Sequence, residues 1–305
     1  MQTFKAQAAE FLKASETRKR NPVRPATLKK YRECIKKHLN PALGNLTLEN
    51  VGNKELKSLI SRLSAEGLSA ATITLNVNIA KQIVASAVND NGDQLCPRTW
   101  NSDFMDLPTI KTQKRPIADA QAIQDAVSQA PTPESALIAL LAGTGLRISE
   151  ALALQVTDSG TNTFWDRLNL KIVVRQQRNG CMLYGPTKTA AGVREVDLAK
   201  ELNDYLEVRL VPHVNGLVFP GCESHYRARL IKYGIMGGYH SLRRFRTTHL
   251  RLQSVPEPIV HFWIGHADQT VTDLYTQVGE KIEARKLHCE KAGLGFSLIL
   301  KAEAA

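Results

Sequence analysis

A short basic segment with two prolines divides this chain into two parts. Residues 106–116 contain Pro108, Pro116 and three basic residues, with little apolar content. Such a composition is typical of a linker rather than of a helix or a strand. The chain has 305 residues, which is enough for two domains that each bury a core. We therefore expect one domain over residues 1–105, a linker over 106–116 and a second domain over 117–305.

The part before the linker is predicted to be helical. Apolar residues at helical spacing follow Thr27, a candidate N-cap, and Pro41 is expected to end that helix. A second amphipathic helix is expected over residues 56–63, and a third begins at Ser69 and ends at the Asn-Asp-Asn-Gly run of 89–92. The first domain is therefore expected to be small, basic and all-helical.

The part after the linker combines helices with a few short strands. The pair Asn179-Gly180 is a strong hairpin signal between two of these strands. Helices are expected at 119–130, at 134–142 and from near Arg147, and strands at 170–175, 181–184 and 193–198. The predicted fold class is mainly α with a small antiparallel β-sheet, an α+β arrangement.

Charge and hydropathy exclude some classes of protein and favour a polyanionic partner. The chain has 40 Lys and Arg against 29 Asp and Glu, and residues 1–40 hold eleven of these cations against three glutamates. Such a block favours nucleic acid as the partner, although a solvated basic face without a partner remains open. The candidate DNA-binding residues are Arg18, Lys19, Arg20, Arg24, Lys29, Lys30, Lys36, Lys37, Lys111, Lys114 and Arg115.

The sequence also indicates a compartment. No apolar run approaches the roughly 20 residues of a membrane span, so no membrane partner is expected. Charged residues such as Lys5 and Glu10 interrupt any secretory signal. The five cysteines are odd in number and scattered, which favours reduced thiols without a disulfide framework or a zinc site. We therefore expect a cytoplasmic protein.

Four segments of the second part contain polar residues that suit a reaction centre. Each has a simple structural explanation when taken alone. In that structural explanation, Arg147 pairs with Glu150, Lys188 near a hairpin tip is simply exposed to solvent, and Tyr275 belongs to the core. The candidates are Arg147, Lys188, His240 with Arg243 on one helical face, His266 after a glycine, and Tyr275 nine residues later.

Together these residues suit nucleophilic substitution at a phosphodiester. The two arginines match the non-bridging oxygens and the extra negative charge of a five-coordinate transition state. Tyr275 would attack the phosphorus, His240 would handle its proton, and Lys188 would protonate the departing sugar oxygen. No carboxylate cluster of the metal-ligand type accompanies them, so we expect neither a metal ion nor another cofactor.

In content, order and spacing these segments closely resemble the tyrosine recombinase (phage integrase) family. That family's pattern is Gly-x-Arg-x-x-Glu, a lysine on a β-hairpin, His-x-x-Arg, Gly-His, and a tyrosine nine residues after that histidine. The catalytic matches in this sequence are Arg147, Lys188, His240, Arg243, His266 and Tyr275. The motifs extend over about 140–280, and the basic helical front part is similar to the family's core-binding domain. One departure is Arg244, where the family often has histidine.

The resemblance implies a site-specific DNA recombinase acting on the nucleoid, in integration, excision or resolution. Four protomers of the family assemble on two double-stranded DNA sites, and each tyrosine cuts one strand. The cut leaves a 3′-phosphotyrosine and a free 5′-hydroxyl, and a 5′-hydroxyl from the partner duplex then displaces the tyrosine without ATP or metal. The resemblance also implies that the segment after the tyrosine, residues 279–305 here, docks on a neighbouring protomer.

Two other functions share parts of this pattern. A type IB topoisomerase uses the same chemistry within one duplex, but its usual motif spacings are longer. A DNA-binding protein of the same fold without activity is the non-enzymatic alternative. The complete set of six matched residues argues against an inactive protein.

Overall fold

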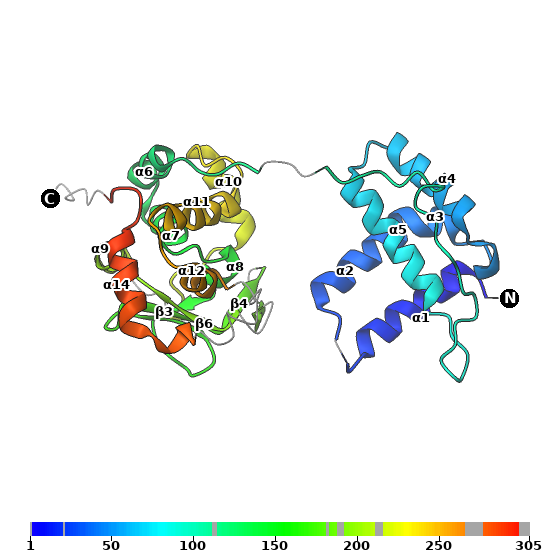
Figure 1. Cartoon of the computed structure of the whole chain (residues 1–305), viewed down its shortest axis with the longest axis horizontal. Helices are drawn as coiled ribbons and strands as arrows, with labels where there is room; N and C mark the ends of the chain where they lie inside the picture. Colours follow the sequence, from blue (N-terminus) through cyan, green and yellow to red (C-terminus); the bar gives the residue numbers. More distant parts are fainter. Residues whose placement is uncertain are drawn as a thin grey trace. The chain divides into compact units, whose positions relative to one another are not determined.

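The chain forms two compact units in the computed structural model. It describes residues 2–20, 22–111, 115–180, 183–187, 192–210, 216–265 and 277–298. The first unit is Met1–Gln113 and the second is Lys114–Ala305, so the boundary falls within the basic segment 106–116 (Figure 1). Each unit has its own apolar core.

Regular structure in the described part of the first unit is helical. The helices are α1 (Phe4–Thr17), α2 (Pro25–Cys34), the π-helix η1 (Ile35–Leu39), α3 (Asn40–Leu43), the 3-10 turn η2 (Leu48–Asn50), α4 (Asn53–Ala65) and α5 (Ala70–Ala85). Side chains from successive helices, among them Phe4, Leu39, Leu63 and Val77, are fully buried in the shared core. The Ser69 hydroxyl caps α5 by accepting a hydrogen bond from the backbone N–H of Thr72 at 3.3 Å.

The prediction that Pro41 ends the helix after Thr27 is wrong. This helix, α2, begins at Pro25 and passes directly into η1 and then α3, which ends at Leu43. Pro41 is the second residue of α3 and directly follows η1, where the N–H of Asn40 donates to Ile35 O, five positions back, in place of the regular four-residue spacing that a proline disrupts. The wide π-turn just before Pro41 makes this position available.

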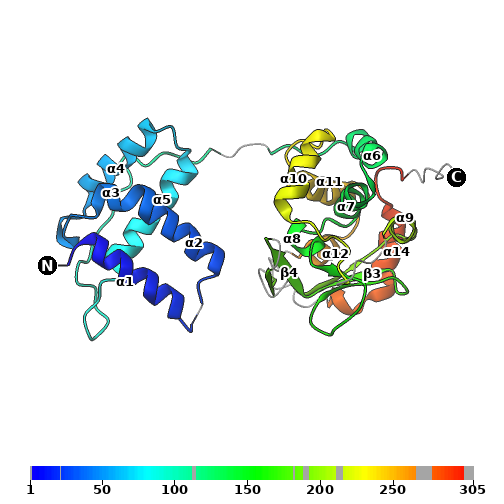
Figure 2. The same cartoon turned by 180° about the vertical axis from the view of Figure 1, so that it is seen from behind.

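In the second unit, several helices pack around one central apolar helix, α7 (Thr132–Thr144). The helices are α6 (Ala120–Gln129), α7 (Thr132–Thr144), α8 (Ile148–Ala151), α9 (Lys200–Arg209), α10 (Glu223–Lys232), α11 (Tyr239–Leu252), α12 (Glu257–Ile264), the 3-10 turn η4 (Val278–Glu280) and α14 (Ile282–Ala292). All of α7 from Glu134 to Thr144 is buried, and α6, α9 and α11 pack around it (Figures 1 and 2). No described helix is long and apolar enough to cross a bilayer.

Two small sheets complete the second unit. The strands are β1 (Leu154–Gln155), β2 (Thr163–Asp166), β3 (Lys171–Val174), β4 (Gln176–Asn179), β5 (Leu183–Pro186) and β6 (Arg194–Asp197). One sheet has the order β1-β2-β3-β6, with Ile172 of β3 opposite Val196 of β6, and the hairpin β4-β5 forms the other. The α+β class is confirmed, but the larger sheet is mixed because β1 and β2 pair in parallel. The four-residue β2 is too short to show a clear alternation in the sequence.

The segment that follows residue 277 packs on its own unit. Helix α14 lies against β6, and the buried Arg285 donates to Asp197 Oδ2 at 2.9 Å and to Glu195 Oε2 at 2.8 Å. After α14, Leu294 and Phe296 are buried in the same core. The segment 279–298 therefore packs one side on its own unit, while other residues, Ile282 and Leu287 among them, are exposed.

Candidate active site

Arg147 lies at a sharp turn between two helices. Helix α7 ends at Thr144, its C-cap Gly145 has a left-handed backbone (φ +73°) that turns the chain, and Arg147 then forms the N-cap of α8. The backbone N–H of Arg147 donates to Glu150 Oε2 at 2.9 Å, and its Nη1 donates to Glu150 Oε1 at 2.7 Å. The side chain of Arg147 is 22% exposed, whereas that of Glu150 is 2% exposed. Glu150 therefore holds the guanidinium of Arg147 from the buried side, while part of the Arg147 side chain reaches the surface.

His240 and Arg243 lie in the first turns of α11, as their spacing predicts. His240 is exposed, whereas Arg243 is buried. Nη1 of Arg243 donates to the carbonyl oxygen of Gly145 at 2.7 Å, and its Nη2 donates to the carbonyl oxygen of Ile264. Arg243 therefore joins the end of α7, beside Arg147, to the end of α12.

Arg244 also makes a defined contact. Its Nε donates to the carbonyl oxygen of Pro116 at 2.8 Å. The arginine that replaces the family's frequent histidine thus holds the start of the second unit against α11.

Three arginines converge on the last carbonyls of α12. Arg194 Nε donates to Trp263 O at 2.7 Å, Arg243 Nη2 donates to Ile264 O, and Arg147 Nη2 donates to Gly265 O at 3.2 Å. Carbonyls at a helix C-terminus lack intrahelical partners and carry the negative end of the helix dipole, so cations are favoured there. The guanidinium groups therefore fix the chain at the residue before His266.

The electrostatic environment keeps these groups in defined protonation states. Burial alone would raise the pKa of Glu150, but the charge and hydrogen bonds of Arg194, together with those of Arg147, hold it below its ordinary value. Burial and the nearby charge of Arg147 lower the pKa of Arg243, which still remains protonated at neutral pH. At neutral pH the site therefore contains an ionised carboxylate between cations.

His240 lies in a strongly positive environment. Partial desolvation lowers the pKa of its imidazole, and the charges of neighbouring arginines, Arg243 and Arg244 first, lower it further. The imidazole is therefore neutral at pH 7 and able to accept a proton.

The structure brings together only part of the predicted set. Arg147, His240 and Arg243 share one region of the second unit, where α7, α11 and α12 meet. Lys188, His266 and Tyr275 lie outside the described residues. Within the described ranges, no group of three or more His, Cys, Asp or Glu is placed to hold a metal ion.

Sequence reasoning did not identify Arg194 as part of this region. This residue begins β6, and its guanidinium reaches Glu150 and Trp263, which are 44 and 69 positions away in the chain. A single arginine before an alternating strand resembles an exposed cation, so the local sequence gives no signal of its burial. Only the folded arrangement reveals these partners.

The predicted DNA-binding residues are exposed wherever the structure describes them. On the first unit Lys29 and Lys30 lie on α2, and Lys36 and Lys37 lie on η1. The other described members are also exposed: Arg18, Lys19, Arg20, Arg24, Lys111 and Arg115. Lys114 lies outside the described residues. Their exposure leaves them accessible to a polyanion without identifying one.

Two family models match the sequence. The model of the phage integrase family matches residues 117–281, which is more than half of the chain. The model of the phage integrase N-terminal SAM-like domain matches residues 8–64. A search of the curated proteins finds no match to the sequence.

Several solved structures are similar to the chain. The Tn1549 transposon integrase in complex with transposon right end DNA has a TM-score of 0.67 and 20% identity, covering 94% of this chain and 99% of that one. A lambda integrase dimer bound to a COC′ core site has a TM-score of 0.61 and 17% identity, covering 90% and 95%. A lambda integrase tetramer bound to a Holliday junction has a TM-score of 0.59 and 16% identity, covering 89% and 79%. These likenesses establish the fold of the chain.

Proposed function

Because the chain belongs to the phage integrase family, the tyrosine recombinases, we propose that Tyr275 is the nucleophile with which it cleaves and rejoins DNA at specific sites. The observation that carries this assignment is the clamp of arginines at the end of α12. Arg147 and Arg243 bind the carbonyls of Gly265 and Ile264. Two phosphate-binding cations are thereby held beside the chain segment that leads to His266 and Tyr275.

The chemistry follows from the residue types. The Tyr275 oxygen attacks the phosphorus and forms a P–O bond, while the bond from phosphorus to the 5′-oxygen breaks. Neutral His240 accepts the tyrosine proton, and Lys188 donates a proton to the leaving 5′-oxygen. Arg147, Arg243 and His266 stabilise the charge of the five-coordinate transition state. Attack by a 5′-hydroxyl of another duplex reverses these steps and restores the tyrosine.

The proposed partner is double-stranded DNA, and the active assembly is a tetramer on two sites. The net charge of +11 and the exposed cations of α2 and η1 support DNA binding. Support for a tetramer comes from the lambda integrase tetramer on a Holliday junction. Docking on a neighbouring protomer is proposed for the segment after the tyrosine, residues 279–305, where Ile282 and Leu287 on the exposed side of α14 are available to a partner. We place this activity on nucleoid DNA in the cytoplasm.

Covalent capture tests the nucleophile and finds the DNA site. Wild-type protein is incubated with fragmented genomic DNA, and the DNA in covalent adducts is sequenced. A synthetic duplex of the recovered sequence is then nicked near the cleavage point, so that the cleaved strand dissociates and the adduct persists. We expect this adduct with wild type and none with Tyr275→Phe, which removes only the hydroxyl. An adduct that persists in Tyr275→Phe contradicts the assignment.

The same substrate distinguishes the other two functions. A protein that only binds DNA retains the duplex without forming an adduct. A topoisomerase forms the adduct and relaxes a supercoiled plasmid, but joins no strand to a second duplex. Strand exchange between two labelled duplexes is therefore the result expected for a recombinase.

A further inference from the structure

Arg194 is the most completely engaged charged residue near the proposed active site. Its side chain is 1% exposed, so it is unable to contact DNA directly. Its Nη1 and Nη2 donate to the two oxygens of Glu150 at 3.2 and 3.0 Å, Nη1 also donates to Gly192 O at 2.9 Å, and Nε donates to Trp263 O at 2.7 Å. A buried guanidinium with this many fixed partners has one orientation.

Each partner of Arg194 lies three or four positions along the sequence from a proposed catalytic residue. Glu150 holds the backbone and side chain of Arg147. Gly192 follows the stretch that contains Lys188, and Trp263 lies two positions before the Gly-His pair. Arg194 thus connects three parts of the site that are far apart in sequence.

The Glu150 carboxylate depends on Arg194. A carboxylate that is buried to this degree is costly unless it is paired and hydrogen-bonded. Arg194 binds both oxygens in a fork, which fixes the plane of the carboxylate and so the position from which Arg147 is held. Without that fork, Arg147 would be the remaining cation on Glu150 and would turn toward it, away from a bound phosphate.

The glycine before His266 is explained by the same contact. Gly265 has a left-handed backbone (φ +68°), and a Cβ there would lie 2.8 Å from Arg194 Cζ. The guanidinium therefore lies against bare backbone at the end of α12. This close approach ties the position of Gly265 directly to Arg194.

We propose that Arg194 is a positioning residue for strand cleavage, which orients Arg147 through Glu150 and fixes the end of α12 before His266. This inference rests on the proposed function. It goes beyond the residues that bind or attack the phosphate, since Arg194 lies beneath them. Its effect should therefore appear in the rate of cleavage and not in DNA affinity.

The first test is Arg194→Lys, which keeps the charge and removes the fork. Adduct formation on the nicked duplex is measured in a single turnover at saturating DNA, and the Kd for DNA is measured separately. We expect the rate to fall about 100-fold, as for a small misplacement of reacting groups, while the Kd changes by less than about 3-fold. A wild-type rate, or a loss that saturating DNA restores, overturns the proposal.

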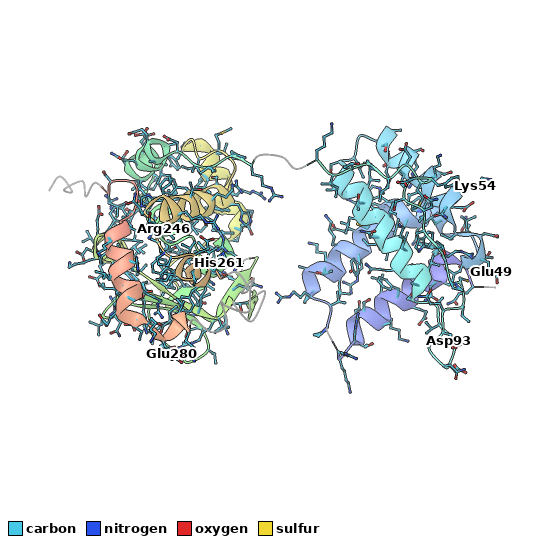
Figure 3. The ribbon with its side chains drawn as sticks, in the orientation of Figure 1. Glu49, Lys54, Asp93, Arg246, His261 and Glu280 are labelled. Atoms are coloured by element: carbon cyan, nitrogen blue, oxygen red, sulfur yellow. The ribbon has the colours of Figure 1, made fainter. Side chains whose placement is uncertain are left out.

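Arg246→Lys is the matched control. Arg246 is 2% exposed and lies on α11 (Figure 3). Its Nη1 donates to Gly293 O, just after α14. Both variants are compared below their unfolding temperatures. Cleavage by Arg246→Lys should stay within about 3-fold of wild type, since the contact that it removes is the one to Gly293 O, and lysine keeps the Cβ and Cγ that lie near Gly145. An equal loss of rate in both variants would make the Arg194 effect merely structural and overturn the proposal.

A double-mutant cycle with Glu150 tests the route of the effect. If Arg194 acts through Glu150, the Arg194→Lys/Glu150→Gln variant should be no more than about 3-fold slower than the slower single variant. A loss of cleavage rate equal to the product of the two single losses would overturn the proposal that Arg194 acts through Glu150.

A second double variant provides for the case that Arg194→Lys does not fold. Glu150→Gln/Arg194→Met leaves no unpaired buried charge and is therefore expected to fold. Cleavage at the wild-type rate by this variant also overturns the proposal. If wild type itself forms no adduct, the proposed function fails instead, so the two failures are distinguishable.

Discussion

The two units of the chain use positive charge in opposite ways. In the first unit, lysines on α2 and η1 extend into solvent. In the second, Arg194, Arg243 and Arg285 are buried and donate to carbonyls or carboxylates of remote segments. An exposed cation costs little and acts through its long-range field, whereas a buried guanidinium is tolerated only with fixed partners. Equal charges are therefore expected to serve binding in the first unit and the geometry of the site in the second.

Among substitutions of basic residues, the largest effect on cleavage at saturating DNA is expected from Arg243→Lys. Lysine keeps the charge but cannot donate to Gly145 O and Ile264 O while also facing a phosphate, because it lacks the planar fork. We expect adduct formation to slow about 100- to 1,000-fold, as when one preorganised donor to a transition state is lost. Single-turnover capture on the nicked duplex measures this rate.

The thermal midpoint and the Kd for DNA must be measured for Arg243→Lys as well. The contrast between the units holds if the protein stays folded at the assay temperature and binds with nearly unchanged Kd. If Arg243→Lys cleaves at the wild-type rate once DNA is saturating, Arg243 acts in DNA binding like the lysines of the first unit, and the contrast between the two units is wrong.

A smaller effect is expected from pH, through His240. Its pKa in the folded protein lies below the ordinary value, so the imidazole is neutral at pH 7 and becomes protonated only in more acidic solution. Below that pKa, cleavage should fall about 10-fold per pH unit, because the proton acceptor is lost. The rate is followed at saturating DNA from neutral to acidic pH.

His240→Gln is the control for that profile. It should lower the rate at pH 7 and remove the acidic decline that belongs to His240. Stability should move in the same direction as the rate in wild type, because the unfolded chain binds a proton at higher pH than the folded one and folding weakens as pH falls through about 6.5. An unchanged profile in His240→Gln would assign the decline to another group.

The sequence predicted the helical first unit, the α+β class and several element boundaries, because these depend on local signals. Ser69 as the cap of α5 is one example, and Asp119 before α6 is another. Pro41 was misjudged, because a preceding π-turn changes what a proline means at that position. Local rules contain no information on such an irregular turn.

The sequence predicts the residue types of the proposed site, but not the buried partners that hold these residues in place. Arg147 and Glu150 are three positions apart, so their pairing is visible in the sequence. The contacts of Arg194 with Glu150 and of Arg243 with Gly145 join segments separated by 44 and 98 positions, and they exist only after folding. A motif identifies groups that suit the chemistry, but the partners that orient them depend on tertiary packing.

The smallest effect on cleavage at saturating DNA is expected from the first unit. The quadruple variant replaces exposed lysines of α2 and η1 with alanine: Lys29→Ala, Lys30→Ala, Lys36→Ala and Lys37→Ala. Each lysine that contacts a phosphate contributes about 0.9 to the slope of log K against log salt, because it releases counterions on binding. The slope should therefore become shallower, by at most about 3.6, and binding should weaken most at low salt.

Binding of the nicked duplex is titrated over a range of salt concentrations, and cleavage is measured once the DNA is saturating. Lys54→Ala, an exposed lysine of α4 outside the predicted set, is the control and should leave the slope unchanged (Figure 3). Because the replaced lysines hold no group of the proposed site, the cleavage rate of the quadruple variant should stay within about 2-fold of wild type.

An unchanged slope would show that these lysines are only a solvated face. A large loss of cleavage rate at saturating DNA would instead show that the lysines of the first unit affect the cleavage step itself. The assignment of binding to the exposed lysines and of site geometry to the buried arginines would then be wrong.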